Sequence, residues 1–322
     1  MDRRRFVGAG VCGALLLPLV ANAQPREKIA RLGFLASGPV RGARSIIAER
    51  LRELGHVEGR NLVIDYRHAE PEEQLRELAT KLVTTGSRVI YAHGPYALRA
   101  ALAASTIIPI VGFDYESDPV AAGYAASLAR PGGNITGVFL DQVEVSAKQL
   151  QLLKEMVPGL SRVAVLFDAA VASAQRESVE GAARRLRVTI APIVWRGPDT
   201  LPAALQSATQ DGARGLIVLS SPHIHERYRQ LVVDAALTRR LPAIGLTLNF
   251  ARDGLLMSYG PVQNDAFRLA AALVAKVLDG TRPADLPIQR PLSFALVINQ
   301  KTAKELGLTI PQSLRVQAEL ID

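Results

Sequence analysis

The chain has 322 residues, of which 48% are hydrophobic and 21% charged, so it is long enough for one large domain or two medium ones. Its formal net charge is +8, but the basic residues are scattered among acidic ones and form no dense patch interleaved with aromatic residues. This pattern argues against binding of nucleic acid. The only cysteine, Cys12, lies near the N-terminus, so the remaining chain can form no disulfide and no thiolate metal site.

The first 23 residues have the three parts of a bacterial export signal. Residues 3–5 form a basic start, residues 6–20 an apolar run, and residues 21–23 an A-x-A cleavage site. The apolar run is shorter than the roughly 20 residues that cross a bilayer. We therefore predict a signal peptide at 1–23 and a soluble, periplasmic mature chain. The pair Arg3-Arg4 is compatible with twin-arginine export and with an ordinary secretory signal.

Short apolar runs alternate with helical patterns along the first part of the chain. We predict strands at 31–36, 61–66, 88–92, 107–113 and 135–139, and helices at 42–54, 71–83, 96–104 and 120–129. The helix at 71–83 has the clearest pattern, because Leu75, Leu78 and Leu82 recur on one face. Pro71 suits its first turn and Gly86 its end.

The same alternation restarts near residues 141–146. We predict strands at 162–167, 188–195, 215–219, 242–246, 255–259 and 294–298, and helices at 146–157, 173–186, 200–210, 225–239, 265–279 and 301–306. Apolar strands that alternate with helices indicate parallel sheets covered by helices on both faces. The two rounds predict an α/β fold with two doubly wound parallel-sheet lobes, which first join at 141–146.

Ligands of open parallel sheets bind beyond the carboxyl ends of the strands, where helix N-termini offer unpaired N–H groups. The loops at these ends contain the candidate ligand-binding residues Ser37, Gly38, His93, Gly94, Pro95, Tyr96, Asp114, Tyr115, Asp118, Ser220, Ser221, Asn249 and Phe250. Tyr96, Tyr115 and Phe250 could sandwich an apolar or aromatic ligand, and Asp114 or Asp118 could hold an ammonium group.

Each of these residues also has a structural interpretation. Gly-Pro pairs are ordinary turn signals, and an Asp before Pro commonly caps a helix, which is the interpretation favoured for Asp118. His93 either contacts the ligand or caps the following turn.

Motifs of catalysis and of nucleotide binding are absent from the sequence. There is no G-x-G-x-x-G after a strand, no G-x-x-x-x-G-K-[ST] and no G-x-S-x-G. His223 and His225 have the spacing of a metal pair, but no carboxylate–histidine helix motif accompanies them, so we predict a solvated loop. We expect no catalytic residue, no cofactor and no metal.

Six segments carry a further signal. They are LRELGHVEGRNLVIDYR at 51–67, DPVAAG at 118–123, SLARPGGNITG at 127–137, QLQLLKEMVPG at 149–159, GLLMSYG at 254–260 and LVINQKTAKELGLTIP at 296–311. In this order, the segments resemble the ABC transporter substrate-binding proteins of the tryptophan/tyrosine type, a branch of the periplasmic binding proteins.

The resemblance implies a type I binding-protein fold, in which two α/β lobes joined by three crossing segments close on a small ligand. It places the later crossings near 260–262 and 287–291. Lobe 1 would then comprise 24–141 plus 262–288, and lobe 2 142–261 plus 289–322.

The resemblance also implies that the loops at 93–96 and 114–118 hold the carboxylate and the amino group of a ligand. The chain departs from its relatives here, because they often have Thr-Pro in place of 93–96 and an acidic residue after Leu219. The candidate ligands are therefore an aromatic amino acid, a related amino acid, another small carboxylate or a small amide.

These features together predict an exported, monomeric receptor that delivers a small ligand to an ABC permease in the inner membrane. The ligand would be captured between the lobes, and contacts made only in the closed state would drive hinge closure. Two other functions fit the sequence. One is a periplasmic ligand sensor for a membrane signalling receptor, and the other, less favoured, is an exported α/β hydrolase.

Overall fold

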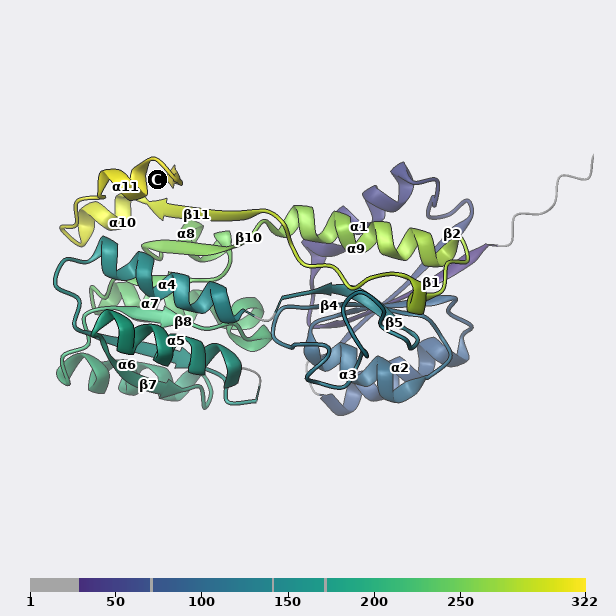
Figure 1. Ribbon diagram of the computed structural model, residues 1–322, viewed down its shortest axis with the longest axis horizontal. Coiled ribbons are helices and arrows are strands. Elements are labelled where there is room, and N and C mark those ends of the chain that lie inside the picture. The colour runs from purple at the N-terminus through teal and green to yellow at the C-terminus, as the bar shows by residue number, and fades with distance from the viewer. Residues whose placement is uncertain (1–28, 70–71, 141, 171–172) are drawn as a thin grey trace, which may run out of the picture.

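The computed structural model describes residues 29–69, 72–140, 142–170 and 173–322, so the predicted signal peptide at 1–23 lies outside the described residues. The described chain forms two β-sheets, and helices cover both faces of each (Figure 1). We call the five-stranded sheet with its helices lobe 1 and the seven-stranded sheet with its helices lobe 2. This architecture confirms the predicted α/β fold with two doubly wound lobes.

The sheet of lobe 1 consists of parallel strands. Their order is β2 (Leu62–Ala69), β1 (Ala30–Ser37), β3 (Val89–His93), β4 (Ile110–Asp114) and β5 (Ile135–Phe139). Helices α1 (Arg41–Glu53) and α9 (Gln263–Leu278) pack on one face, and α2 (Glu72–Thr84) and α3 (Pro95–Ala104) on the other. β4 and β5 are buried along their whole length, which explains their nearly uninterrupted apolar sequences.

The sheet of lobe 2 has seven strands. Their order is β12 (Ala318–Ile321), β11 (Phe294–Asn299), β10 (Met257–Pro261), β9 (Ala243–Gly245), β8 (Leu216–Val218), β6 (Arg162–Phe167) and β7 (Thr189–Val194). Helices α4 (Val143–Met156), α5 (Ser173–Leu186), α10 (Gln300–Glu305) and α11 (Gln312–Arg315) cover one face. Helices α6 (Leu201–Gln210), α7 (Arg229–Thr238) and α8 (Leu248–Arg252) cover the other. Short helical turns lie at η1 (Pro198–Thr200), η2 (His223–Arg227) and η3 (Pro283–Asp285).

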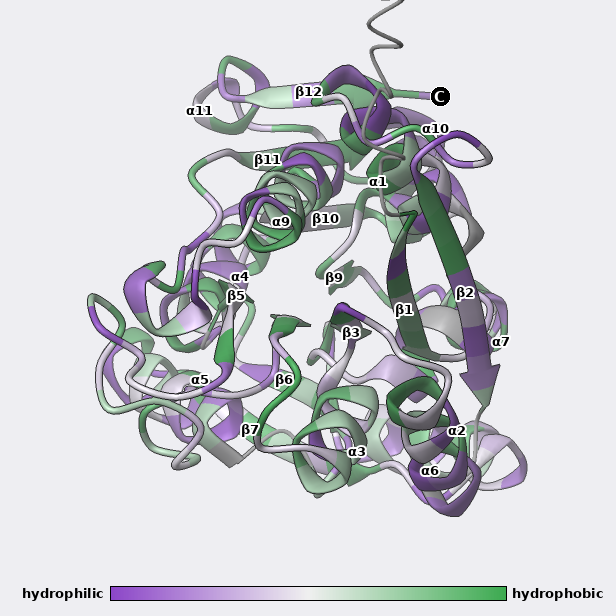
Figure 2. Ribbon diagram, turned by 90° about the vertical axis from the view of Figure 1, so that its right-hand side faces the viewer, coloured by the Kyte–Doolittle hydropathy of each residue, from purple (hydrophilic) through white to green (hydrophobic). Residues whose placement is uncertain are grey.

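The flanking helices alternate between apolar and polar residues along their length (Figure 2), as expected for helices that bury one face. One strand pair departs from the parallel pairing, because β11 runs antiparallel to β10. Between these two strands the chain leaves for lobe 1 as α9 and then returns. It therefore enters the sheet of lobe 2 from the opposite end.

The chain passes between the two sheets three times. It passes from β5 to α4, from β10 to α9, and from the segment after η3 to β11 (Figure 1). Before the third passage, Gln289 attaches to the edge strand β5. Its N–H donates to the carbonyl of Gly137, and its own carbonyl accepts from the N–H of Phe139, both at 2.9 Å. The segment after β10 thus completes lobe 1, although it comes late in the sequence.

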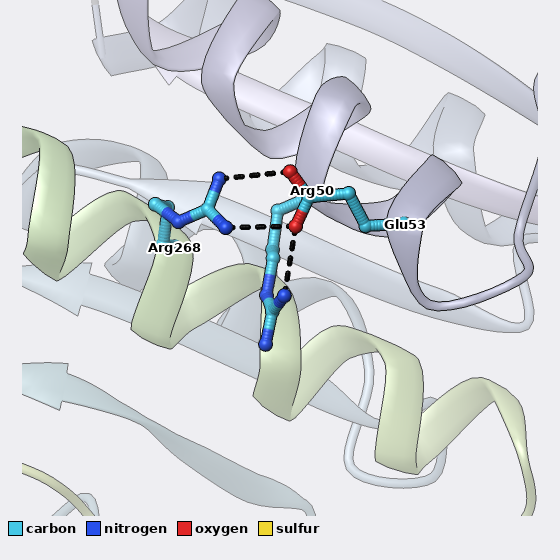
Figure 3. A network of polar contacts seen from close by, with 3 residues as sticks. All are labelled: Arg50, Glu53 and Arg268. Atoms are coloured by element: carbon cyan, nitrogen blue, oxygen red, sulfur yellow. Dashed lines mark hydrogen bonds and ion pairs between the residues drawn. The ribbon is translucent and has the colours of Figure 1, made fainter.

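An ion-pair network joins α9 to α1 on the surface of lobe 1 (Figure 3). The Arg268 guanidinium donates to both carboxylate oxygens of Glu53, at 3.2 and 2.7 Å, and Arg50 donates to one of them at 2.8 Å. The hydrogen bonds from Arg268 and then Arg50 lower the pKa of the Glu53 carboxyl to about 2. Residues 215 positions apart in the sequence are therefore held side by side.

The helix predicted at 120–129 does not form, and turns occupy this segment instead. Gly123 adopts a φ of +74°, which interrupts a helical backbone. The turns place the carbonyl of Leu128 so that it accepts a hydrogen bond from the N–H of Ile288 at 2.8 Å. The segment thus meets the returning chain, a tertiary contact that local sequence patterns do not reveal.

Two further predictions near strand ends are corrected. Asn249 and Phe250, expected in a loop, lie within the short helix α8. The helix expected at 225–239 begins as the π-helical turn η2 and continues as α7.

Candidate functional site

A cavity lies between the two lobes, at the carboxyl ends of strands from both sheets. It has about 490 Å³ of empty space, part of which is open to solvent. Its lining comprises Ser37, His93, Gly94, Phe113, Tyr115, Glu116, Pro222, His225, Leu246, Thr247 and Gln263. Lobe 1 contributes the ends of β1, β3 and β4, and lobe 2 contributes the segments after β8 and β9. This is the position at which open parallel sheets bind ligands.

The wall contributed by lobe 1 is aromatic. The His93 ring stacks on Phe113, with ring centroids 4.9 Å apart, and Phe113 packs against Tyr115 at 4.7 Å and Phe267 at 4.9 Å. His93 Nδ1 lies 3.0 Å from the hydroxyl of Tyr91. Burial lowers the pKa of His93 to about 4, so this imidazole is neutral at pH 7. The wall therefore offers a flat, uncharged surface to a ligand.

Two carboxyl groups lie beside this aromatic wall, directly after β4. The Asp114 side chain is fully buried, and its Oδ1 accepts a hydrogen bond from the Glu116 N–H at 2.8 Å. Burial raises the pKa of both carboxyls, and the neighbouring Asp114 raises the pKa of Glu116 further. Glu116 also reaches lobe 2, because its Oε1 accepts a hydrogen bond from the Ser220 hydroxyl at 2.5 Å.

The wall contributed by lobe 2 contains a second buried histidine. His225 is only 7% exposed, and its ring packs edge-on against Phe250 with centroids 5.3 Å apart. Burial, and then the positive charge of Arg229, lower the pKa of His225 to about 3. The prediction of a solvated loop was wrong here, because the π-helical turn η2 directs residue 225 inward.

The cavity is separated from a larger one on the hinge side by Leu246 and Gln263, which line both. The larger cavity has about 920 Å³ of empty space and also contacts the second crossing. A Cβ on Gly260 would lie 2.2 Å from the Leu246 carbonyl oxygen, so only glycine permits this approach. The second crossing thus packs directly against the cavity wall.

The candidate residues of lobe 1 divide into two groups. Ser37, His93, Gly94 and Tyr115 line the cavity, and Gly38 lines a smaller space that shares Ser37 and Pro222 with it. Asp114 does not line the cavity, but it is fully buried and lies in the chain between the lining residues Phe113 and Tyr115.

The other three lie outside the cavity. Pro95 and Tyr96 form the first turn of α3, and the Tyr96 ring contacts His223 of lobe 2 at 5.3 Å. Asp118 is exposed, and its Oδ1 accepts from the N–H groups of Val120 and Ala121, which is a capping role.

None of the candidate residues of lobe 2 lines the cavity between the lobes. Ser220 donates to Glu116, and Ser221 donates to Asp168 Oδ2 at 3.1 Å. Phe250 is fully buried behind His225. Asn249 lines the hinge-side cavity.

Seven lining residues were not among the candidates, namely Phe113, Glu116, Pro222, His225, Leu246, Thr247 and Gln263. Glu116 and Pro222 lie within loops that the sequence analysis had already singled out, so their position in these loops was enough to make them candidates. Gln263 is the first residue of α9, directly after a crossing between the lobes. It could not be found without knowing where that crossing falls.

Within the residues that the structure describes, no group of three or more His, Asp and Glu side chains is arranged to hold a metal ion. Over the same ranges, no helix combines the length and the hydropathy that are needed to span a bilayer.

The chain is similar to known binding proteins over nearly all its described length. The family model for ABC transporter substrate binding proteins matches residues 28–321. The tyrosine-binding protein of Clostridioides difficile (strain R20291) is 25% identical over 262 residues, which are 80% of this chain and 74% of that protein.

Two solved structures share the fold, which is that of type I periplasmic binding proteins. A conserved domain protein from Vibrio cholerae superposes with a TM-score of 0.84 at 23% identity, covering 92% of this chain and 100% of that one. A domain from Streptococcus pneumoniae in complex with L-Trp gives a TM-score of 0.82 at 22% identity, covering 91% and 99%. The extent of the family match leads to one conclusion: the chain belongs to the ABC transporter substrate-binding protein family.

Proposed function

We propose that the protein is an exported solute receptor that binds a small ligand between its lobes and delivers it to an ABC importer. The observation that carries this proposal is the cavity at the carboxyl ends of β1, β3, β4, β8 and β9, lined by both lobes. We propose lobe boundaries of 24–141 plus 262–288 for lobe 1 and 142–261 plus 289–322 for lobe 2.

The ligand that we propose is an amino acid or a related small carboxylate or amide. The names of two related proteins support this class, since one is a tyrosine-binding protein and the other was crystallised with L-Trp. The aromatic wall at His93, Phe113 and Tyr115 suits a flat or apolar side chain.

Binding would proceed by closure of the lobes around the ligand, without a chemical step. The hydrogen bond between Glu116 and Ser220 and the ring contact between Tyr96 and His223 join opposite lobes. Such contacts exist only when the lobes are close, so they stabilise the closed state together with the ligand. The permease would then recognise the surface that closure creates.

Export fits this function. The basic start, the apolar run and the A-x-A site of residues 1–23 support a cleaved signal peptide, and hence a periplasmic receptor. Family membership supports the same location and a permease partner in the inner membrane.

A thermal-shift screen of the purified chain lacking residues 1–23 tests the proposal. The panel contains amino acids, aromatic acids and small amides. A ligand at 100 times its Kd stabilises the protein by about 2.7 kcal/mol, which is readily measured. Small-angle scattering with and without each hit then measures closure. Stabilisation without turnover and with a smaller radius of gyration is the expected result, and catalytic consumption of a hit would contradict the proposal.

A further inference from the structure

The larger cavity, on the hinge side, has no role in the proposed capture of the solute. This hinge-side cavity has about 920 Å³ of empty space, part of which is open to solvent. Ile46 of α1 and Phe267 of α9 line it from lobe 1, Leu248 of α8 lines it from lobe 2, and residues 260–262 of the second crossing also line it. A space of this size between two lobes can hold a small molecule.

The floor of the hinge-side cavity is a row of residues across the sheet of lobe 2. Ser258 of β10 lies opposite Val297 of β11, and Val297 lies opposite Glu319 of β12. Residues opposite one another in paired strands point to the same face of a sheet, and all three line this cavity. Neighbouring strands are about 4.8 Å apart, so the Cα of Glu319 lies roughly 10 Å from that of Ser258. Glu319 is therefore at the outer end of the floor, on the exposed edge strand, and Ser258 at the inner end.

The hydroxyl of Ser258 is buried and lacks a partner. The residue is 1% exposed, and its Oγ makes no hydrogen bond with any described residue. Met257 and Tyr259, its neighbours along β10, pack into the core beneath α4 and α5. Because side chains alternate along a strand, Ser258 points away from that core and into the cavity. A buried polar group without a partner costs free energy, so a ligand that accepts a hydrogen bond from this hydroxyl binds more tightly.

Helices α8 and α9 bring positive charge to the same cavity. Arg252 of α8 lines it and has no ion-pair partner in the part of the chain that the structure describes. Gln263 and Asn264 line it from the first turn of α9, a helix of 16 residues whose N-cap residue, Val262, provides no side-chain cap. The N–H groups of this turn have no acceptor within the helix. Arginine side chains and helix N-termini both favour a carboxylate. Asp265, in the same turn, is exposed and does not line the cavity.

We propose that the hinge-side cavity is a second binding site, which takes a small monocarboxylate with an apolar body. Ser258, Arg252 and the first turn of α9 would supply donors to the carboxylate oxygens. Ile46 and Phe267 would pack against the apolar body. The charge of Glu319 at the outer end of the floor would disfavour a second carboxylate. This inference goes beyond the proposed function, because it concerns a ligand other than the solute between the strand ends.

The two sites are adjacent, so the test has to separate them. Leu246 and Gln263 line both cavities, and Phe267 contacts Phe113 of the aromatic wall with ring centroids 4.9 Å apart. Ser258 and Arg252 line the hinge-side cavity but not the cavity at the strand ends. Changes at these two residues therefore report on the second site alone.

Titration calorimetry with four matched probes, on the chain lacking residues 1–23, tests the inference. 3-Phenylpropionate, 3-phenylpropanamide and 3-phenylpropylamine share a ring and a spacer but are anionic, neutral and cationic. The fourth probe, 4-(2-carboxyethyl)benzoate, adds a second carboxylate at the far end of the ring. We expect 3-phenylpropionate to bind, the amide to bind at least about tenfold more weakly, and the amine and the dicarboxylate to bind more weakly still.

Ser258→Leu fills the inner end of the cavity, and Arg252→Gln removes its positive charge. We expect each change to weaken the binding of 3-phenylpropionate at least about tenfold, and Arg252→Gln also to reduce the preference for the acid over the amide. Arg315→Gln is the matched control, because it makes the same change at an exposed arginine of lobe 2 that does not line the cavity. The control should bind like the parent. Arg252 is exposed, so the test stands even if Ser258→Leu does not fold.

Crystals soaked with 3-(4-bromophenyl)propionate locate the site directly, because the anomalous signal of bromine marks the ring. We expect a bromine peak in the hinge-side cavity, beside Ile46 and Phe267.

Four results would overturn the inference and leave the proposed function intact. They are no binding of 3-phenylpropionate, equal binding of the acid and the amide, an affinity unchanged by Arg252→Gln, and bromine found only between the strand ends or on the surface. The reverse outcome is also distinguishable. If no solute of the thermal-shift screen binds, but 3-phenylpropionate does and Arg252→Gln weakens it, the proposed function fails and the second site stands.

Discussion

The two lobes treat the polar groups at their strand ends in opposite ways. In lobe 2, Ser221 donates to Asp168, and Gln175 accepts from the N–H of Ser220. In lobe 1, Ser37 Oγ and the Tyr115 hydroxyl have no partner among the described residues. Lobe 2 thus pairs Ser221 and the N–H of Ser220 within itself, whereas lobe 1 leaves the hydroxyls of Ser37 and Tyr115 at the cavity without a partner in the described chain; His225 Nε2 of lobe 2 also lacks one there.

This difference indicates that the two lobes have different roles in ligand binding. Lobe 1 offers an aromatic wall, a carboxyl pair formed by Asp114 and Glu116, and hydroxyl groups without a partner in the described chain, so we expect it to form the main binding surface. We expect lobe 2 to close over it and to contribute His225, a few apolar side chains and the hydroxyl that Ser220 donates to Glu116. Ligands should therefore contact lobe 1 first and lobe 2 on closure.

The largest effect is expected from a matched pair of phenylalanines. Phe113→Ala in lobe 1 and Phe250→Ala in lobe 2 each remove a buried ring, which costs about 3–5 kcal/mol of stability. Only Phe113 lines the cavity and stacks on His93, so only its loss should weaken ligand binding about 100-fold. Urea unfolding and calorimetry below the melting range measure the two effects. Equal losses of affinity in the two variants would contradict the proposed difference between the lobes.

Acid should destabilise both lobes through their buried histidines. The pKa is lowered to about 4 for His93 and to about 3 for His225, below the unfolded value of 6.5. The unfolded chain then binds more protons, so the stabilisation is fully present above pH 6.5 and is lost as the pH falls towards about 4 for His93 and about 3 for His225. Each histidine should lower the free energy of unfolding by about 2 kcal/mol at pH 5 relative to pH 7.

The carboxyl pair acts in the opposite direction, because the pKa of each carboxyl is raised. The measurement should therefore compare the parent with His93→Gln and His225→Gln in urea unfolding at pH 7 and pH 5. In each variant, the decrease in the free energy of unfolding between pH 7 and pH 5 should be smaller than in the parent by the contribution of the replaced histidine. A parent and variants with the same pH dependence would show that the rings are accessible to protons in both lobes.

A serine in lobe 2 should matter for stability and not for binding. Ser221→Ala leaves Asp168 Oδ2 buried without its donor, which costs about 1–3 kcal/mol. The free energy of unfolding should fall by this amount while the Kd of the ligand stays within about twofold. A large loss of affinity would instead place Ser221 in the binding surface.

The smallest effect on stability is expected from the corresponding serine of lobe 1. Ser37 Oγ has no partner in the described chain, so Ser37→Ala should change the stability by less than about 0.5 kcal/mol. It should still weaken binding several-fold, because the hydroxyl lines the cavity. A stability loss equal to that of Ser221→Ala would remove the distinction between the lobes.

Much of the fold could be predicted from the sequence because the strands are short apolar runs and the helices repeat at regular spacing. β5 and β6 were predicted with the bounds that the structure shows. The prediction of a helix at 120–129 was wrong, because the positive φ of Gly123 and the hydrogen bond to Ile288 determine the conformation of that segment. Ser37, His93 and Tyr115 could be predicted to lie at the cavity because they stand at strand ends. His225 could not be predicted, because the π-helical turn that directs it inward is not visible in the sequence pattern.

The late return of the chain to lobe 1 has a consequence for the order in which the protein matures. The ring of Phe267 and the small side chains of Ala270 and Ala271 on α9 cover one face of a sheet whose five strands all end by residue 139. Until that helix and Gln289 have left the ribosome, α1 is the helix available to cover this face, and the apolar residues that α9 buries stay exposed. We therefore expect the N-terminal half to need protection from aggregation during synthesis, and a chain truncated before residue 263 should aggregate instead of folding on its own.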